Sequence, residues 1–141
     1  MTSAHAVLED LLAATRASRV TLRRDVAGAA AFPVVDEALA AGVASLRDEQ
    51  SVHLPSQPVV LEVQRGVQVV QNDCSTAYED EAFQRMLTVY GGLAAQIVTP
   101  IVVLDRLEAI LSVHQLATPR EWTADEVAAA TTAAARLREL L

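Results

Sequence analysis

The order of apolar and polar residues along the chain predicts alternating helices and strands. Helices are predicted where apolar residues recur every three or four positions, and strands where they alternate or form short β-branched runs. The predicted helices are 4–16, 34–46, 79–90 and 123–141. The predicted strands are 19–25, 59–64, 67–72, 95–103 and 107–116.

Turn and capping residues set the boundaries of these segments. Arg65-Gly66 separates two β-branched runs and predicts a hairpin, and residues 104–106 predict a second one. Gly91-Gly92 ends the third helix. Thr123 followed by Glu126 forms a capping box that starts the last helix. Residues 47–58, with two prolines, are expected to form an irregular connection, and Gly28 with Pro33 marks a loop.

This order of elements favours a single α+β domain over residues 1–141. The strands come mostly in adjacent pairs, which predicts antiparallel pairing, and the helices are segregated from them. Pro100 has no backbone N–H to donate, so it indicates an edge or a bulge in its strand. We find no internal repeat, low-complexity segment or linker.

Charge and composition exclude several classes of function. The net charge is −7, and all eleven basic residues are arginines. The only local group, at positions 16, 19, 23 and 24, is expected to be a solvated face, so we predict no nucleic-acid partner. No apolar run is long enough to span a bilayer, and the N-terminus lacks signal-peptide features, which predicts a cytoplasmic protein without a membrane partner. With one cysteine and no suitable ligand spacing, we expect neither a disulfide nor a metal.

The segment TPIVVLDRLEAILSVHQLATPREWTADE, residues 99–126, together with the order of elements, resembles the GAF domain family. The resemblance extends from Ala4 to Leu141, and it indicates a small stand-alone bacterial GAF protein. It implies a central antiparallel sheet of five or six strands. Helices at the two ends of the chain would cover one face, and a small-molecule pocket would lie on the other face.

One strand carries the main candidate for ligand binding. Alternate residues of a strand point to opposite faces. Leu107, Ala109, Leu111, Val113 and Gln115 share one face, and Glu108, Ile110, Ser112 and His114 share the other. The first set suits packing beneath the terminal helices, and the second mixes polar and apolar groups as a pocket does. His114 also falls where the first histidine of a "C-H-H-x-x-P-R" motif lines the chromophore pocket of phytochrome GAF domains. The alternative for His114 is a buried histidine with purely structural hydrogen bonds.

Other signatures of the family are missing. Cyclic-nucleotide-binding members carry Asn-Lys and a later Phe-x-x-x-Asp-Glu, whereas FPVVDE at 32–37 has no Asn-Lys partner. Bilin-binding members need an attachment cysteine, often followed by histidine, whereas Cys74 is followed by Ser75. We therefore predict no bound cofactor.

Further candidates come from a loop and from two polar residues. Asp73, Cys74, Ser75 and Thr76 follow a strand and open a helix, where they could bind an anion or simply cap the helix. Cys74 is either an activated thiol or a buried small residue. Tyr90 and Gln96 are expected on the pocket side, while Phe83 and Met86 suit the core. Trp122 is expected to pin the last helix, with Arg120 and Glu121 facing solvent.

Three functions follow from these candidates. The first is a sensor that binds a small polar or anionic metabolite through His114, Ser112, Asp73, Cys74, Tyr90 and Gln96, beneath a roof formed by residues 73–90. We expect no attached kinase, cyclase or DNA-binding region, and therefore output through a partner or a homodimer formed by the alanine-rich first and last helices. The second is a small enzyme with Cys74 as nucleophile, His114 as general base and Asp73 orienting it. The third is a ligand-free dimerisation scaffold.

Overall fold

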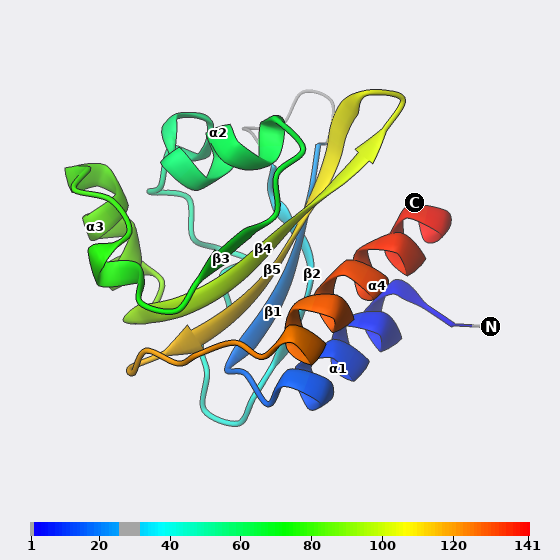
Figure 1. The fold of residues 1–141 in the computed structure, drawn as a ribbon, viewed down its shortest axis with the longest axis horizontal. Helices are drawn as coiled ribbons and strands as arrows, with labels where there is room; N and C mark the ends of the chain where they lie inside the picture. The colour runs from blue at the N-terminus through cyan, green and yellow to red at the C-terminus, as the bar shows by residue number, and fades with distance from the viewer. Residues whose placement is uncertain (1, 26–31) are drawn as a thin grey trace.

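A five-stranded antiparallel sheet forms the centre of the molecule (Figure 1). The computed structural model describes residues 2–25 and 32–141, so the loop predicted at Gly28 lies outside the described residues. In sheet order the strands are β2 (Val34–Leu39), β1 (Arg19–Arg24), β5 (Arg106–Leu116), β4 (Leu93–Val103) and β3 (Val69–Gln71). Every neighbouring pair is antiparallel. The predicted α+β class and the five-stranded antiparallel sheet are confirmed.

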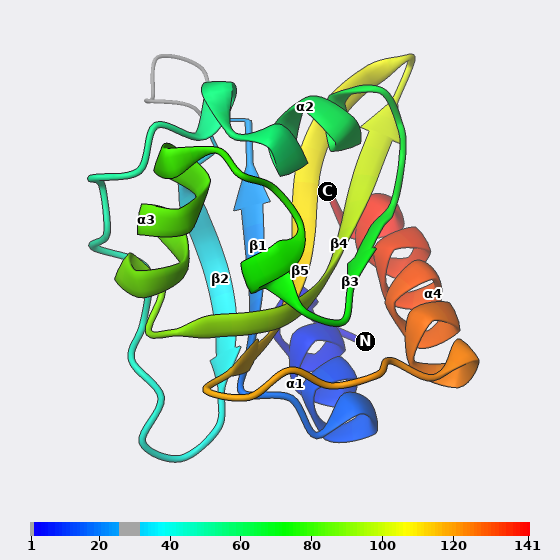
Figure 2. The ribbon, with the colours of Figure 1, turned by 60° about the vertical axis from the view of Figure 1, so that its left-hand side comes forward.

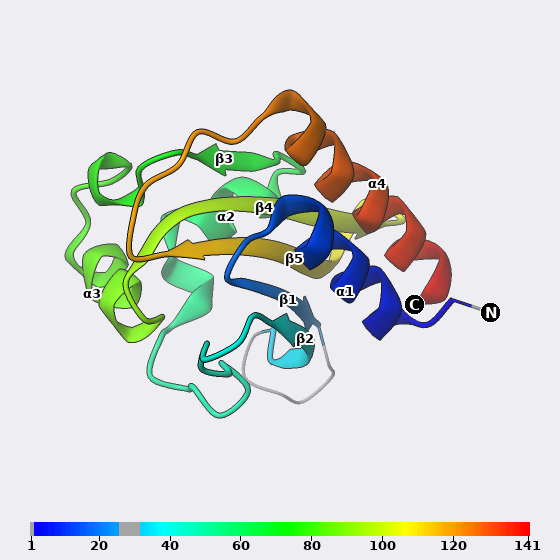
Figure 3. The same ribbon diagram turned by 90° about the horizontal axis from the view of Figure 1, so that it is seen from below.

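The helices divide between the two faces of the sheet. The terminal helices α1 (Ala4–Thr15) and α4 (Ala124–Leu140) lie side by side on one face, as Figure 3 shows. On the other face lie α2 (Pro58–Gln64), α3 (Glu81–Val89) and the short 3₁₀ helices η1 (Leu54–Ser56) and η2 (Cys74–Thr76), as Figure 2 shows. This is the predicted arrangement, with the terminal helices on one face and a cavity on the other.

Each face of the sheet has its own hydrophobic core. Val20, Leu22, Ala109, Leu111 and Val113 point toward α1 and α4 and pack with Leu8, Leu11, Ala134 and Leu137. Val98 and Ile110 point the other way and pack with Val59, Val63, Phe83, Met86 and Leu87. The period-two alternation of β1 and β5 thus decides which side chains reach the second face, where the cavities lie.

Two predicted elements are wrong. Residues 34–46 were expected to be helical, but Val34–Leu39 forms strand β2, paired with β1. Residues 59–64 were expected to form a strand, but Pro58–Gln64 is helix α2, so the hairpin predicted at Arg65-Gly66 is wrong as well. Proline is favoured at the first helical position, and the buried Val59, Val60 and Val63 follow helical spacing. The Val-rich composition, which favours strands, is overridden by this spacing and by burial against the sheet.

The last hairpin and the last helix form as predicted. Leu104 and Asp105, which join β4 to β5, have φ values of 52° and 62°, as a type I′ turn requires. The capping box at Thr123 and Glu126 is present with both of its hydrogen bonds. Gly91 and Gly92 end α3 with positive φ angles, which glycine adopts at no steric cost.

Candidate functional site

Two neighbouring cavities lie between the sheet and the elements on its second face. The inner chamber, of about 40 Å³, has room for roughly three water molecules. Its apolar wall consists of Leu54, Val59, Val60, Met86, Val98 and Ile110, and its polar wall of Arg23, Gln57, Tyr90, Gln96, Ser112 and His114. The outer cleft, of about 700 Å³, is lined by residues 49–55 with Pro33, Val34 and Arg47. Arg23, Leu54 and Tyr90 line both cavities and so mark their junction.

The register of the sheet brings four of the predicted residues to the inner chamber. Ile110, Ser112 and His114 of β5 line it, whereas Ala109, Leu111 and Val113 belong to the core beneath the terminal helices. His114 pairs with Gln96 on β4 and with Arg19 on β1. Tyr90, at the end of α3, completes the wall. The division of faces predicted for this strand is therefore found, and contact of His114, Ser112, Tyr90 and Gln96 with a ligand stays a prediction.

His114 is held as a neutral hydrogen-bond donor. Its Nδ1 accepts from Nε of Arg19 at 3.1 Å, so the ring proton sits on Nε2. Burial, and then the positive charges of Arg19 and Arg23, lower the pKa of His114 well below its usual value. The ring stacks on Tyr90 with centroids 5.9 Å apart and an interplanar angle of 27°. A neutral imidazole with Nε2–H suits donation to an oxygen and does not exchange protons near neutral pH.

Two arginines that were expected at the surface are buried beside the site. Arg19 is 1% exposed and Arg23 is 7% exposed, because both share the cavity face of β1, opposite Val20 and Leu22. Arg19 donates to the carbonyl oxygen of Tyr90 at 2.8 Å, and Arg23 donates to the Tyr90 hydroxyl at 3.0 Å. The expectation of a solvated face is therefore wrong for these two positions. The alternation that placed Val20 and Leu22 in the core was the signal that could have found them.

Two glutamine side chains, Gln57 and Gln96, line the inner chamber. Nε2 of Gln96 donates to Oε1 of Gln71 on β3 at 2.8 Å. Gln57, just before α2, is 4% exposed, and its Nε2 donates to the carbonyl oxygen of Ala82. Within the described part of the chain, Oε1 of Gln57 is buried with no hydrogen-bond partner. Gln57 was not predicted, because residues 47–58 gave no periodic pattern to place it.

Asp73 and Cys74 lie apart from both cavities. Asp73 Oδ1 accepts from the backbone N–H of Ser75 at 3.0 Å, so it caps the short helix η2. Cys74 is fully buried in the second core cluster, and burial raises the pKa of its thiol to about 12. Neither residue, nor Ser75 or Thr76, lines the inner chamber or the outer cleft. Of the roof expected from residues 73–90, Met86 and Tyr90 line the inner chamber, and Leu54, Gln57, Val59 and Val60 line it as well.

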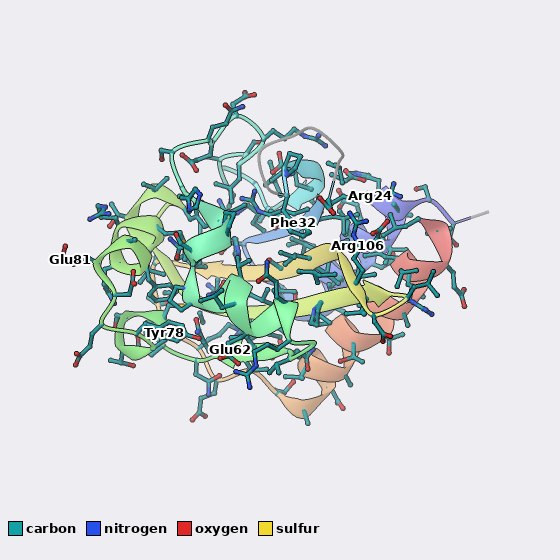
Figure 4. The ribbon with its side chains drawn as sticks, turned by 90° about the horizontal axis from the view of Figure 1, so that it is seen from above. Arg24, Phe32, Glu62, Tyr78, Glu81 and Arg106 are labelled. Carbon is teal, nitrogen blue, oxygen red and sulfur yellow. The ribbon has the colours of Figure 1, made fainter. Side chains whose placement is uncertain are left out.

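Figure 4 looks onto this side of the molecule, with α2 in front of the sheet. Phe32, whose carbonyl oxygen accepts from Arg23 at 3.1 Å, lies toward the end marked by Arg24 and Arg106. Glu81 marks α3 at the opposite end. The outer cleft opens near Phe32, since its neighbours Pro33 and Val34 line it.

A second polar network joins the site to the terminal helices. The indole N–H of Trp122 donates to the carbonyl oxygen of Gln71 at 3.0 Å, and Arg120 lies over the indole ring at 4.2 Å. Arg120 also donates to the carbonyl oxygen of Thr15 at 2.7 Å and to Glu126. Trp122 therefore pins α4 as predicted. The expectation that Arg120 faces solvent is wrong, because its side chain is only 24% exposed.

The described residues were also searched for a metal site and for a membrane-spanning helix. Across residues 2–25 and 32–141, no cluster of three or more His, Cys, Asp or Glu side chains could hold a metal ion. None of the helices in those same ranges has the length and apolar character needed to cross a membrane.

Comparison with known proteins places the chain among GAF domains. The sequence model of the GAF domain matches residues 2–139. The blue-light absorbing form of the PixJ GAF domain of Thermosynechococcus elongatus is 26% identical, with a TM-score of 0.71 over 97% of this chain and 86% of that one. The chromophore-binding domain of the bacteriophytochrome RpBphP3 from R. palustris is 18% identical, with a TM-score of 0.79 over 97% and 52%.

A domain of a protein described as a two-component sensor histidine kinase, from Sinorhizobium meliloti 1021, is 18% identical. Its TM-score is 0.67, over 96% of this chain and 85% of that one. No curated protein matches the chain.

Proposed function

Since the chain belongs to the GAF domain family, we propose that it is a sensory domain that binds a small polar or anionic metabolite. The ligand occupies the outer cleft and reaches into the inner chamber. Photoreceptor and sensor-kinase GAF domains among the similar structures support a sensory role. Occupancy is passed on through a homodimer or a partner protein.

The observation that carries this proposal is the set of polar groups turned into a largely apolar chamber. Within the described residues, Oε1 of Gln57 is buried with no hydrogen-bond partner, and the hydrogen bonds of the His114 ring are made by Nδ1. A buried polar atom without a partner costs about 1–3 kcal/mol. A ligand that donates a hydrogen bond to Oε1 of Gln57 recovers that free energy, and His114 lines the same chamber. The outer cleft, at about 700 Å³, falls within the range of about 300–1,000 Å³ typical of small-molecule pockets.

A chromophore attached through a cysteine does not fit these residues. The attachment needs a thiol on the cavity wall, and Cys74 is the only cysteine in the chain. It is fully buried in the core cluster with Phe83, outside the lining of both cavities. We therefore propose a ligand that binds without a covalent bond.

The positions of Cys74 and His114 do not favour the alternative function, a small enzyme that uses these two residues. That alternative needs the Cys74 thiol as a nucleophile within hydrogen-bond reach of His114. His114 Nδ1 instead accepts from Arg19, and burial keeps the thiol protonated at neutral pH. The ligand-free scaffold remains as the reading that an experiment must exclude.

Thermal unfolding in the presence of a metabolite library tests the proposal. A ligand present at 100 times its dissociation constant adds about 2.7 kcal/mol to the free energy of unfolding. We expect at least one compound to raise the unfolding temperature of the wild-type chain. Ser112→Leu fills the inner chamber with apolar atoms, so the same compound should stabilise that variant far less.

The control is Thr132→Leu, an exposed position on α4 far from both cavities, which should keep the full response. If no compound in the library stabilises the wild-type chain, the sensor is excluded and the scaffold is favoured. If Ser112→Leu responds as strongly as the wild type, the ligand binds somewhere other than the inner chamber.

A further inference from the structure

The cavity face of β1 holds two buried arginines that have no ion-pair partner. Arg19 donates to His114, Tyr90 and Ala44, and Arg23 donates to Phe32 and Tyr90. Each of these acceptors is a carbonyl oxygen, a hydroxyl oxygen or a neutral ring nitrogen. No ion pair in the described part of the chain includes Arg19 or Arg23. The remaining residues, Met1 and 26–31, contain no acidic side chain that could supply one.

The nearest carboxylates are bound to other groups. Glu37 accepts from the hydroxyl of Ser45 and from the backbone N–H of Leu46 at 3.2 Å. Glu49 accepts from the backbone N–H and the hydroxyl of Ser51. Both groups act on the arginines only through space, without direct contact. A buried charge that lacks a hydrogen-bonded counter-charge is costly, so these arginines leave a local positive site within an acidic chain.

Arg23 is placed to share its charge with a ligand. It lines both the inner chamber and the outer cleft, whereas Arg19 lies behind His114 and lines neither. The two hydrogen bonds of Arg23 use one N–H of each terminal nitrogen, which leaves other N–H groups of the fork for an incoming oxygen. The wall of the outer cleft also carries Arg47, which is paired with Asp36 and Glu37, together with His53 and the carboxylate of Glu49.

A second feature of the same cavity calls for a hydrogen-bond donor on the ligand. Gln57 lines the inner chamber, and its Oε1 is buried with no partner within the described residues. The chamber, at about 40 Å³, admits only the end of a molecule, such as a hydroxyl or amide group. The rest of the molecule must lie in the outer cleft, against the apolar side chains of Val34, Val52 and Leu54.

From these features we infer that the ligand is an amphipathic organic anion. Its carboxylate or phosphate binds the guanidinium of Arg23 at the junction of the two cavities, its body occupies the outer cleft, and a small uncharged donor group faces Gln57. The inference rests on the proposed small-molecule function and adds the charge of the ligand and the residue that selects it. Arginine suits this role because its planar fork binds two oxygens of one anion.

Matched pairs of probes test the charge of the ligand directly. One series pairs carboxylic acids, from acetate and lactate to benzoate, 4-hydroxybenzoate and naphthoate, with their primary carboxamides. A second pairs phosphate monoesters with the parent alcohols. Binding is measured by calorimetry and by thermal unfolding at constant ionic strength. We expect anions of one series to bind and their neutral partners to fail, and the series that binds identifies the anionic group. Within the acids, 4-hydroxybenzoate should bind more tightly than benzoate because its hydroxyl can donate a hydrogen bond to Gln57.

Variants of β1 test the selecting residue. Arg23→Gln should weaken binding of the anion about tenfold or more, the loss expected for a charge-assisted hydrogen bond. Arg24→Gln removes the same charge from the next residue, on the opposite face of the strand, and should bind like the wild type (Figure 4). Arg23→Lys keeps the charge without the fork and should retain the preference for the anion at lower affinity. If Arg23→Gln does not fold, the comparison of acids with amides on the wild type still decides the charge.

Each other outcome overturns a defined part of the inference. Amides that bind as tightly as their acids would remove the anionic requirement and leave the proposed sensor intact. Anions that bind equally to Arg23→Gln and the wild type would remove Arg23 as the selecting residue. If no probe and no compound of the metabolite library binds the wild type, the proposed function fails together with this inference.

Discussion

The imidazole of His114 shows how one buried side chain is fixed by its neighbours. It lies 3% exposed between Arg19 and Gln96 in the row of paired residues across the sheet. Burial and the two nearby guanidinium groups disfavour its charged form, and they lower its pKa. The ring is therefore a permanent donor in the inner chamber, in contrast to a histidine that changes charge near neutral pH.

This state makes the stability of the chain depend on pH. The folded pKa of His114 lies below the unfolded value, so between the two the unfolded chain binds more protons than the native one. The free energy of unfolding should therefore fall as pH drops below about 6.5, by up to about 1.4 kcal/mol per pH unit for this group. His114→Gln should remove this part of the slope in denaturant unfolding between pH 5 and 7.

His5→Gln is the matched control. The hydrogen bond to Asp36 raises the pKa of this exposed histidine, so its effect has the opposite sign: it stabilises the native state at low pH, and stability is lost as pH rises. Removing it should lower the stability below about pH 6.5 by a constant amount and leave the slope there unchanged, because its own slope lies above that pH. Equal slopes in His114→Gln and the wild type would show that His114 is not held neutral.

The sequence partly predicted which side chains near the site lie on the cavity face of the sheet. Alternation along 107–116 correctly separated Ser112 and His114 from the core residues between them. The same argument applied to β1 would have placed Arg19 and Arg23 on the cavity face, but charge alone suggested solvent. Burial of arginine depends on acceptors such as the Tyr90 carbonyl, 71 positions away in the chain, and no local pattern reveals them.

At the scale of elements, Arg120 joins three segments that are distant in sequence. Its guanidinium binds the last turn of α1 through Thr15, the end of β5 through Gln115, and the first turn of α4 through Glu126. The carbonyl oxygen of Thr15 lies at the C-terminal end of α1, where a positive charge such as that of Arg120 is favourable. The packing of the terminal helices against the sheet should therefore depend on this residue.

Arg120→Gln should lower the free energy of unfolding by about 1.5–3 kcal/mol, the range for hydrogen bonds to charged groups. Arg136→Gln, an exposed arginine on α4 that lies 3.8 Å from Asp10, should cost less than about 1 kcal/mol. Urea unfolding of both variants measures the difference. Equal losses would mean that the Arg120 network adds no more than an ordinary surface pair.

Element types were predictable where one strong local signal was present. The capping box at Thr123 and the helical stripe of 79–90 both led to correct helices. The predictions for segments 34–46 and 59–64 are wrong because their amino-acid composition favours a different structure from the one that pairing and burial impose. The alanines after Leu39 suggested a helix, but residues 34–39 pair with β1 as a strand. The valines of α2 suggested a strand, but Pro58 and the helical spacing of the buried residues favour a helix.

At the scale of the whole molecule, the sheet separates two layers with different roles. One layer consists of α1 and α4, packed on each other and on the sheet, and the other contains α2 and α3 (Figure 1, Figure 2). The cavities lie in this second layer. The outer surfaces of α1 and α4 carry exposed alanines, Ala13, Ala14, Ala128 and Ala135. Small side chains allow close approach of helices, so this surface remains our prediction for a homodimer contact.

Light scattering coupled to size-exclusion chromatography should give the mass of two chains at micromolar concentration. Ala135→Arg places a long charged side chain in the predicted contact and should yield single chains. Val89→Arg introduces the same charge at an exposed position on α3, in the other layer, and should leave the dimer intact. A wild-type chain that elutes as a monomer at every concentration would exclude this interface.

The overall arrangement was the most predictable level. Periodicity, together with the likeness of residues 99–126 to GAF domains, predicted the two terminal helices and the two central strands joined by a tight turn. It also predicted that one face of the sheet carries the cavity. The size of the cavities was not predictable, because it depends on how α2 and residues 47–55 fold over the sheet, and that stretch of sequence has no clear period.

The hydrogen bond from Trp122 to Gln71 has an optical consequence. The chain has a single tryptophan, and the carbonyl group to which its indole is bonded belongs to the residue whose side chain holds Gln96 in the chamber wall. An occupant that displaces Gln96 alters the electric field at the indole, and the wavelength of its fluorescence shifts with that field. The fluorescence of Trp122 thus reports whether a ligand occupies the inner chamber, and no added dye is needed.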